Sequence, residues 1–277
     1  MSDERELQRE LTRAALTALD GRAFALAGSG AIREHGIVDR ATQDVDLFTN
    51  DLDPAAFDAA VDALAGDLTR SGFDVDQVRR SQQFAQLRIT TGDGRSVDMD
   101  LAVDWREREP VTLAVGPVLS LSDAVGSKLN ALYTRAEARD YLDVDAIRAS
   151  GHFTDQQLVD AAAERDAGFE RTMFASQLDQ VQRIRPERVA RYGVDAEQLD
   201  AIKQRFTEWA SQLREPEAAL ATPPLDPELQ KIVELHRRDY PISATEIRPP
   251  SSPPQGRNYQ PPSTDARAQQ HGLGEYR

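Results

Sequence analysis

Residues 40–48 read Arg-Ala-Thr-Gln-Asp-Val-Asp-Leu-Phe, and this stretch decides the fold class. Its carboxylates alternate with apolar residues, which is typical of a half-buried strand, and we expect that strand over Val45 to Phe48. The side chains of Asp44 and Asp46 would lie on one face, with Cα atoms about 6–7 Å apart, while apolar side chains anchor the other face. Two carboxylates in this arrangement can hold divalent metal ions.

A two-metal phosphoryl-transfer centre, with ions about 3.5–4 Å apart, usually takes a third carboxylate from a neighbouring strand. The stretch Val97-Asp-Met-Asp-Leu101 predicts such a strand, and Asp98, Asp100 and Asp104 would share one face of it. Asp100 has the more apolar neighbours and is favoured for that reason. The pattern alone leaves all three open.

Other Asp-x-Asp pairs occur at 51/53, 74/76 and 143/145, as expected in a chain with 47 acidic residues. The first pair suits a turn and a helix N-cap, and the second suits the solvent face of a strand. Asp143 and Asp145 fall in a predicted helix, where residues i and i+2 do not face each other. We therefore attribute these three pairs to structure.

A glycine-rich turn, Gly28-Ser29-Gly30, follows a predicted strand over Phe24 to Ala27 and opens a short helix that ends near His35. Backbone N–H groups and a hydroxyl in this position can cradle phosphate oxygens. On its own such a turn is more often an ordinary flexible connection. Combined with strand-borne carboxylates, it indicates a nucleotide phosphate site.

The first 118 residues alternate helix-like and strand-like segments, which predicts a small mixed α/β sheet. Outside the segments above, we expect helices over 4–19 and 54–70 and strands over 73–78, 84–90 and 96–103. From Ser122, the expected N-cap, apolar residues recur with a period of 3.6 to about residue 150. Further helices are predicted over 154–165, 168–181 and 195–213.

Eleven of the fifteen prolines lie in the last sixty-two residues. That stretch cannot bury enough apolar surface to offset ordering entropy, so we predict a mostly disordered tail with a short helix over Pro227 to Arg238. Binding of a partner through polyproline II segments is the minority interpretation. The expected organisation is an α/β domain over 1–118, an all-helical domain over 119–215 and a proline-rich tail over 216–277.

Composition excludes several classes of protein. A formal charge of -14 argues against a generic nucleic-acid coat protein, and the absence of cysteine removes disulfides, thiolate metal sites and cysteine nucleophiles. Four scattered histidines make a zinc enzyme a poor fit. No apolar run near the N-terminus approaches the ~18 residues of a membrane span, so we expect no membrane partner and a cytoplasmic location.

Two motifs recur together in a known family. The first comprises Gly28-Ser-Gly-Ala31, His35-Gly36 and Arg40-Ala-Thr42-Gln-Asp44-Val-Asp46-Leu-Phe, and the second is Lys128-Leu-Asn-Ala-Leu-Tyr-Thr-Arg135-Ala-Glu-Ala-Arg139-Asp140-Tyr-Leu-Asp143. Together they resemble the motifs of the AbiEii-type (MenT-like) nucleotidyltransferase toxins, within the DNA polymerase β-like nucleotidyltransferase superfamily. The resemblance covers roughly residues 20–215. Many relatives have Gly-Gly where this chain has Gly28-Ser29, which matches the Gly-Ser form of the wider superfamily.

Carried over position by position, the resemblance implies that Asp44, Asp46 and Asp100 bind Mg²⁺, with two ions, and that Gly28 and Ser29 hold a triphosphate. Lys128 matches the family lysine. It is one of only three lysines among 33 basic residues, which favours a specific role for its compact ammonium group. The implied nucleotide-binding set is Gly28, Ser29, Arg40, Thr42, Lys128, Arg139 and Asp140, although Arg139 and Asp140 could equally pair with neighbouring helices.

The resemblance implies attack by an acceptor hydroxyl on the α-phosphate of an NTP, in a toxin of a toxin–antitoxin or phage-defence system with a cognate antitoxin. Some relatives modify the 3′ end of tRNA. A local basic patch could bind such an RNA or be ordinary solvated surface; its residues are Arg183, Arg185, Arg188, Arg191, Lys203 and Arg205. The alternatives are a protein or aminoglycoside-like small-molecule acceptor, and a non-catalytic protein that binds nucleotide or a partner.

Overall fold

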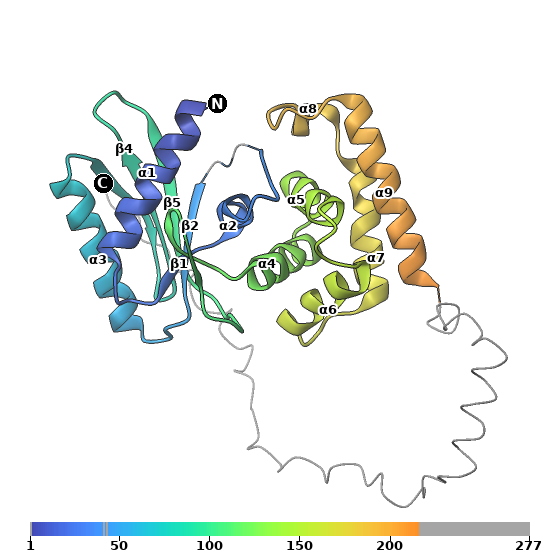
Figure 1. Ribbon diagram of the computed structural model, residues 1–277, viewed down its shortest axis with the longest axis horizontal. Helices are drawn as coiled ribbons and strands as arrows, with labels where there is room; N and C mark the ends of the chain where they lie inside the picture. Colours follow the sequence, from blue (N-terminus) through green and yellow to red (C-terminus); the bar gives the residue numbers. More distant parts are fainter. Residues whose placement is uncertain (1, 41, 43, 216–277) are drawn as a thin grey trace, which may run out of the picture. The chain divides into compact units, whose positions relative to one another are not determined.

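The computed structural model describes residues 2–40, 42 and 44–215, and within them the predicted α/β sheet is present (Figure 1). The strands form one mixed sheet in the order β3-β4-β5-β2-β1-β7-β6. Their bounds are β1 Phe24–Leu26, β2 Asp44–Thr49, β3 Asp74–Arg80, β4 Phe84–Thr90, β5 Ser96–Val103, β6 Val111–Leu113 and β7 Gly116–Val118. The strands β2 and β5 run parallel, and both β1 and β4 run antiparallel to their central neighbours.

Helices cover the sheet and form the second half of the described chain. Their bounds are α1 Ser2–Ala18, α2 Gly28–Glu34, α3 Pro54–Arg70, α4 Leu121–Thr134, α5 Ala138–Ala149, α6 Asp155–Arg165, α7 Arg171–Asp179, η1 Gln180–Arg183, α8 Pro186–Ala190 and α9 Ala196–Arg214. In β2, Val45 and Leu47 are buried while Asp44 and Asp46 lie on the opposite, partly open face. That second face is the one next to α2, which lies between the sheet and α4 (Figure 1).

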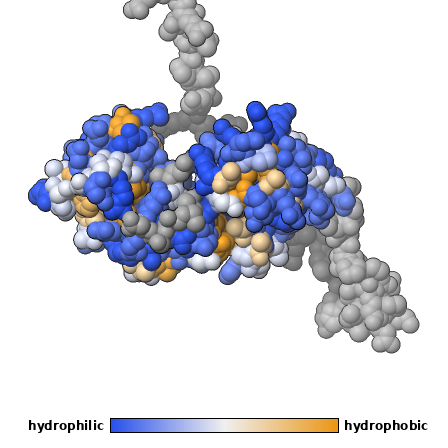
Figure 2. Space-filling view, turned by 90° about the horizontal axis from the view of Figure 1, so that it is seen from above, coloured by the Kyte–Doolittle hydropathy of each residue, from blue (hydrophilic) through white to orange (hydrophobic). Residues whose placement is uncertain are grey.

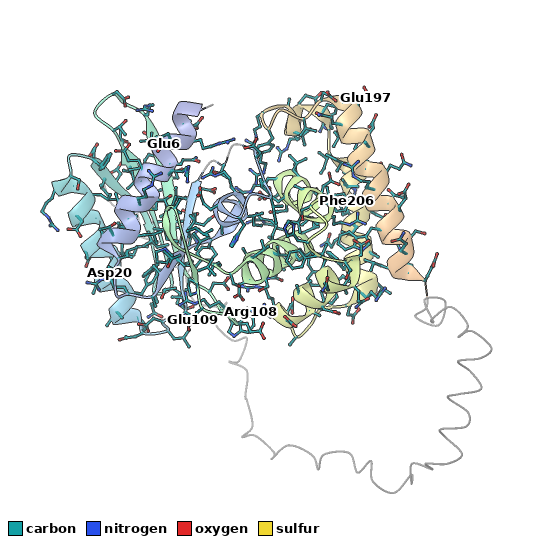
Figure 3. The ribbon with its side chains drawn as sticks, in the orientation of Figure 1. Glu6, Asp20, Arg108, Glu109, Glu197 and Phe206 are labelled. Carbon is teal, nitrogen blue, oxygen red and sulfur yellow. The ribbon has the colours of Figure 1, made fainter. Side chains whose placement is uncertain are left out.

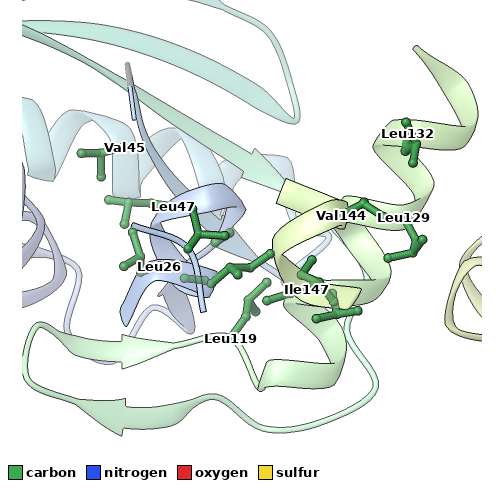
Figure 4. Packing of buried hydrophobic residues seen from close by; sticks show 14 of the residues in the cluster. Leu26, Val45, Leu47, Leu119, Leu129, Leu132, Val144 and Ile147 are labelled. Atoms are coloured by element: carbon green, nitrogen blue, oxygen red, sulfur yellow. The ribbon is translucent and has the colours of Figure 1, made fainter. Parts of the chain in front are cut away.

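One buried apolar cluster runs through both halves (Figure 4). Leu26 and Leu47 of the sheet belong to the same cluster as Leu129 of α4 and Ile147 of α5. Whether 1–118 and 119–215 fold as separate domains therefore stays a prediction. The proline-rich tail and its expected helix over 227–238 lie outside the described residues.

Aromatic side chains pack between the helices of the second half of the described chain. Phe206 lies between α9 and α5 (Figure 3), with its ring edge-on to Tyr141 at 5.1 Å between centroids. Trp209 packs edge-on to Phe174 at 5.4 Å. The surface in Figure 2 is largely hydrophilic with small separate apolar patches, and none of the described helices is long and apolar enough to cross a membrane.

Several local predictions were wrong. The N-cap of α4 is Ser120, whose hydroxyl accepts a hydrogen bond from the Asp123 N–H at 3.1 Å, so the helix begins two residues before the Ser122 cap would allow. The helical sequence after it is two helices, because Ala136 takes a left-handed conformation with φ of 50° and a capping box between Glu137 and Asp140 starts α5.

Other differences concern short elements. The strands β6 and β7 were not predicted, because each has only three residues and Pro117 lies within β7. The short helix α8 was also missed, and α7 begins at Arg171 rather than at Gly168. In contrast, α3 begins as expected, with Asp53 accepting from the Ala55 N–H at 3.0 Å and Pro54 in the first turn.

Candidate active site

Three carboxylates meet on the open face of the sheet. Parallel pairing of β2 with β5 sets Asp46 opposite Asp100, and Asp44 lies two residues before Asp46 on the same face. One carboxylate oxygen from each of Asp44, Asp46 and Asp100 lies within 4.8 Å of the others. Oxygen ligands in this number and spacing suit a hard divalent cation.

The structure separates Asp100 from the other two candidates for the third carboxylate. Asp98 forms a two-point ion pair with Arg88, with N–O distances of 2.8 and 3.1 Å. Asp104 accepts a hydrogen bond from Arg165 at 2.5 Å. The Asp100 carboxylate accepts from Gln86 at 2.9 Å, and among the three it alone joins the cluster.

The cluster is electrostatically unfavourable without a cation. Burial, followed by the charges of Asp44 and Asp100, raises the pKa of Asp46 from an ordinary 3.8 to about 7, although Lys128 and Arg139 act in the opposite direction. Burial also raises the pKa of Asp100, and Asp44 adds to that effect. A bound cation would favour the ionised form of both carboxyls.

Gly28 is the residue at which α2 approaches the cluster. Its φ is +56°, and a β-carbon added there would lie 1.8 Å from Oδ2 and 2.7 Å from Cγ of Asp46. Next to it, the Ala27 N–H donates to the Asp46 carbonyl at 2.8 Å. Glycine is therefore required both for the left-handed backbone and for the space that the Asp46 side chain occupies.

A buried ionic network lies behind Gly28 and joins α2 to α4 and α5. The Ser29 hydroxyl donates to Oδ2 of Asp143 at 2.8 Å and accepts from Lys128 at 3.1 Å and from Arg40 at 2.7 Å. Asp143 itself lies 2.9 Å from the Lys128 ammonium and 2.6 Å from Arg40 Nε, and its side chain is fully buried. Burial alone would raise the pKa of Asp143, but Lys128 and Arg40 hold it below its ordinary value.

Asp143 and Asp145 lie in one helix with different partners, as the i, i+2 spacing predicts, and neither belongs to the carboxylate cluster; the place of Asp143 in a buried network was not predicted. Asp143 follows Asp140 by three residues, so both carboxylates lie on the same face of α5. Spacing within the second motif, Arg139-Asp140-Tyr-Leu-Asp143, was the signal that could have identified it. Asp145 points elsewhere and forms an ion pair with Arg205 at 2.7 Å.

The other predicted residues lie around this network. Asp140 accepts two hydrogen bonds of 2.9 Å from Arg135 and lies 3.6 Å from Lys128. Arg139 lies 3.4 Å from Asp44 at the edge of the carboxylate cluster. Thr42 is buried apart from both, where its hydroxyl donates to Gln8 at 2.7 Å and accepts from Arg33 at 3.0 Å. Its contacts tie the chain before β2 to α1.

A cavity of about 280 Å³ opens beside the cluster. Gly28, Asp46 and Lys128 line this cavity together, and Asn130 and Arg165 also lie on its walls. Asn130 lies within the second motif but was not among the predicted site residues, and Arg165 lies outside both motifs. The lining residues are Gly28, Asp46, Phe48, Asp104, Ser127, Lys128, Asn130, Ala131, Thr134, Arg135 and Arg165.

Three solved structures are similar to this chain, and one of them has a TM-score above 0.5. A putative nucleotidyltransferase from Helicobacter pylori aligns over 80% of this chain and 100% of its own, with 15% identity and a TM-score of 0.51. JHP933 from the same organism aligns over 85% and 97%, with 16% identity and a TM-score of 0.47. MenT4, a nucleotidyltransferase toxin from Mycobacterium tuberculosis, aligns over 84% and 89%, with 18% identity and a TM-score of 0.46.

Comparison with curated proteins gave no match. The family model described as "Nucleotidyl transferase AbiEii toxin, Type IV TA system" matches residues 9–234, which is well over half of the chain. The match includes both motifs, the carboxylate cluster and the buried network, and it confirms the resemblance on which the site residues were chosen. The chain belongs to the AbiEii family of nucleotidyltransferase toxins and is a nucleotidyltransferase.

Proposed function

We propose that the chain transfers a nucleoside monophosphate from an NTP to the 3′-hydroxyl of an RNA acceptor, preferably tRNA, in a reaction that depends on Mg²⁺. One observation supports this most strongly: the carboxylates of Asp44, Asp46 and Asp100 converge within 4.8 Å, and Asp46 faces the same cavity as Lys128. Addition of a nucleotide to the 3′ end would leave the tRNA unable to be aminoacylated, which would account for the action of a toxin of this family.

The carboxylate cluster fits two Mg²⁺ ions, because its ligand atoms are all carboxylate oxygens and its charges repel one another in the empty state. Bound Mg²⁺ would neutralise charge on the phosphates and polarise the α-phosphate. Asp44 and Asp46 would hold the ions on the nucleotide side. Asp100 would lie beside the acceptor hydroxyl and, kept ionised by the bound cation, would be available to receive its proton.

The triphosphate would bind where Gly28, Ser29 and Lys128 converge. The Lys128 ammonium is already oriented by Asp143 at 2.9 Å and Asp140 at 3.6 Å, so its position requires no reorganisation when an anion arrives. Arg135, hydrogen-bonded to Asp140, lies on the same cavity wall. During transfer the acceptor oxygen bonds to the α-phosphorus while the bond to the bridging oxygen breaks, and pyrophosphate leaves with its charge balanced by these cations.

An RNA acceptor is favoured by one segment of the helical half. Within the described part of the chain, Arg183, Arg185 and Arg188 have no carboxylate partner, and Arg191 stacks on Tyr192 instead. Arg205, which the patch was expected to include, is held by Asp145. The proposed RNA-binding patch is thus the segment Arg183 to Arg191, which can attract phosphates despite the overall charge of -14.

The family of type IV toxins to which the chain belongs implies an antitoxin. We propose that a cognate antitoxin inhibits this chain in the cytoplasm, where tRNA is found.

A protein or small-molecule acceptor remains the alternative. The test is to incubate the protein with Mg²⁺, each α-labelled NTP and a cell extract, and then to separate RNA, protein and small molecules. Label in tRNA-sized RNA is expected, and Asp46→Asn, checked for folding, should abolish it.

Label in protein or in a small molecule would contradict the RNA acceptor and support the alternative. An absence of transfer to any acceptor, with NTP still bound, would favour a non-catalytic nucleotide-binding protein.

A further inference from the structure

An exposed tryptophan lies beside two residues that line the active-site cavity, Asp104 and Arg165. Trp105 is 53% exposed, whereas Trp209, the other tryptophan of the chain, is buried in the helical half. Trp105 directly follows Asp104, which lines the cavity. Large exposed aromatic side chains are uncommon in a folded surface and often mark a place where a ligand stacks.

Arg165 holds the backbone of Trp105, and its guanidinium also lies over the indole. Arg165 donates to the Trp105 carbonyl at 2.9 Å and to the Asp104 carboxylate at 2.5 Å, and its guanidinium lies 5.5 Å from the centre of the Trp105 ring. Only 6% of the Arg165 side chain is exposed. A ring on a backbone held in this way loses less conformational freedom when a flat ligand stacks on it.

A second feature of the same cavity is an unsatisfied amide. Asn130, on α4, lines the cavity, and its carboxamide makes no hydrogen bond with any described residue. The Oδ1 atom is buried, so water does not compensate it in this conformation. Buried polar atoms are usually paired, and rotation of the Asn130 carboxamide would present it to a polar group that enters the cavity.

We propose that Trp105 and Asn130 form the nucleobase subsite: the base of the NTP stacks on the Trp105 ring, and Asn130 hydrogen-bonds its edge. This inference rests on the proposed function, because it assumes that the triphosphate lies at Lys128 in the same cavity. Stacking on an indole is tolerant of sequence, since every base has a flat π-face. A carboxamide offers one acceptor and one pair of donors, and by rotating it can meet either an amino or a carbonyl group.

Fluorescence titration tests the stacking contact. A wild-type protein titrated with Mg²⁺ and NTP, without acceptor, should show quenching of Trp105, and Trp105→Phe should lose the quenching while the Trp209 emission reports an intact core. Trp105→Ala should weaken binding of all four NTPs about tenfold or more by calorimetry. Inorganic tripolyphosphate, which has no base, should bind the wild type and Trp105→Ala equally.

The outcomes separate this subsite from the proposed function. If wild-type protein binds NTP and Trp105→Ala binds it equally well, the stacking subsite is wrong while the nucleotide site stands. If Trp105→Ala weakens tripolyphosphate as much as NTP, the residue supports the phosphate site and the inference is likewise overturned. If the wild type binds no NTP at all, both the subsite and the proposed function are wrong.

Base selectivity tests Asn130. Asn130→Asp can only accept hydrogen bonds from the base when ionised, so it should favour amino-bearing bases. The CTP-to-UTP and ATP-to-ITP ratios of association constants should each rise at least tenfold over the wild type, because uracil and hypoxanthine lack the amino group that cytosine and adenine carry. Using ratios cancels the general effect of the added charge on the phosphates. Ratios that stay at the wild-type values would overturn the role of Asn130 in reading the base edge.

Discussion

Substituting Gly28 by alanine isolates the geometry of the carboxylate cluster. The new β-carbon would lie 1.8 Å from Oδ2 of Asp46 and 3.1 Å from its Cβ, so the side chain cannot avoid it by moving its tip alone. Reaching an ordinary contact of 3.4 Å requires a shift of about 1.6 Å, the difference between 3.4 and 1.8 Å. Metal–ligand distances tolerate only about 0.2 Å.

The Gly28→Ala substitution carries two costs, the strain of a left-handed alanine and the collision with Asp46, and a second glycine separates them. The left-handed backbone at Gly28 costs an alanine roughly 1–2 kcal/mol, which for a protein of this size lowers the Tm by roughly 2–8 °C. Gly21 has a similar φ of +74° but nothing within 4 Å of its added β-carbon. Gly21→Ala should therefore show the same loss of stability without the collision with Asp46.

Transfer activity should distinguish the two variants. Loss of one correctly placed metal ligand removes on the order of 3 kcal/mol of transition-state stabilisation, or more than 100-fold in kcat/KM. We expect this loss in Gly28→Ala and near wild-type turnover in Gly21→Ala, measured by label transfer from α-labelled NTP beside thermal unfolding. Equal activity of the two alanine variants would refute the placement of Gly28 against a metal-binding Asp46.

Three further predictions concern pH, the buried network and a helix cap. Because the pKa of Asp46 rises from 3.8 to about 7 on folding, the native state without metal binds more protons than the unfolded state, and its stability should fall as pH rises from about 4 to 7. The increase in Tm that Mg²⁺ produces should accordingly be larger at pH 8 than at pH 5, and a pH-independent increase would contradict this. Asp143→Asn leaves buried cations unbalanced and should lower the free energy of unfolding in urea by about 3 kcal/mol, whereas Asp145→Asn, which breaks a partly exposed pair, should cost at most about 1 kcal/mol. Equal costs would argue against the network. Ser120→Ala should lose about 1 kcal/mol of stability by the same measurement and Ser122→Ala much less, and the reverse order would show that the N-cap is misplaced.

The central strands could be predicted because their two faces differ in chemistry. In β2 and β5 the alternation of aspartate with buried Val, Leu and Met defines which residues share a face. The carboxylate of β5 that lies opposite Asp46 could not be predicted from this alternation. Asp98, Asp100 and Asp104 have the same parity, so only the pairing of Asp46 with Asp100 decides among them, and that pairing arises from tertiary structure.

The buried ionic network was beyond local sequence reasoning for a different reason. Ser29 and Asp143 are separated by 114 residues, and the charge on Asp143 is acceptable inside the protein only because Lys128 and Arg40 converge on it. An isolated Asp-x-Asp in a helix gives no indication of such partners. Likewise, Asn130 lies in the second motif without being marked there as a site residue, and Trp105 belongs to no motif. Asn130 became a candidate because it lines the cavity beside Asp46, and Trp105 because its ring lies beside Arg165 on the cavity wall.

The rate of nucleotide transfer in Asp100→Asn, compared with that in Asp98→Asn, tests the central claim most directly. The two residues lie on one face of β5, but Asp100 joins the carboxylate cluster whereas Asp98 pairs with Arg88. Both variants should remain folded. With Mg²⁺, α-labelled NTP and tRNA, Asp100→Asn should lose more than 100-fold in transfer rate, whereas Asp98→Asn should stay within a few-fold of the wild type. Full transfer by Asp100→Asn, or equal loss in both, would contradict a metal-dependent nucleotidyltransferase centre built from Asp44, Asp46 and Asp100.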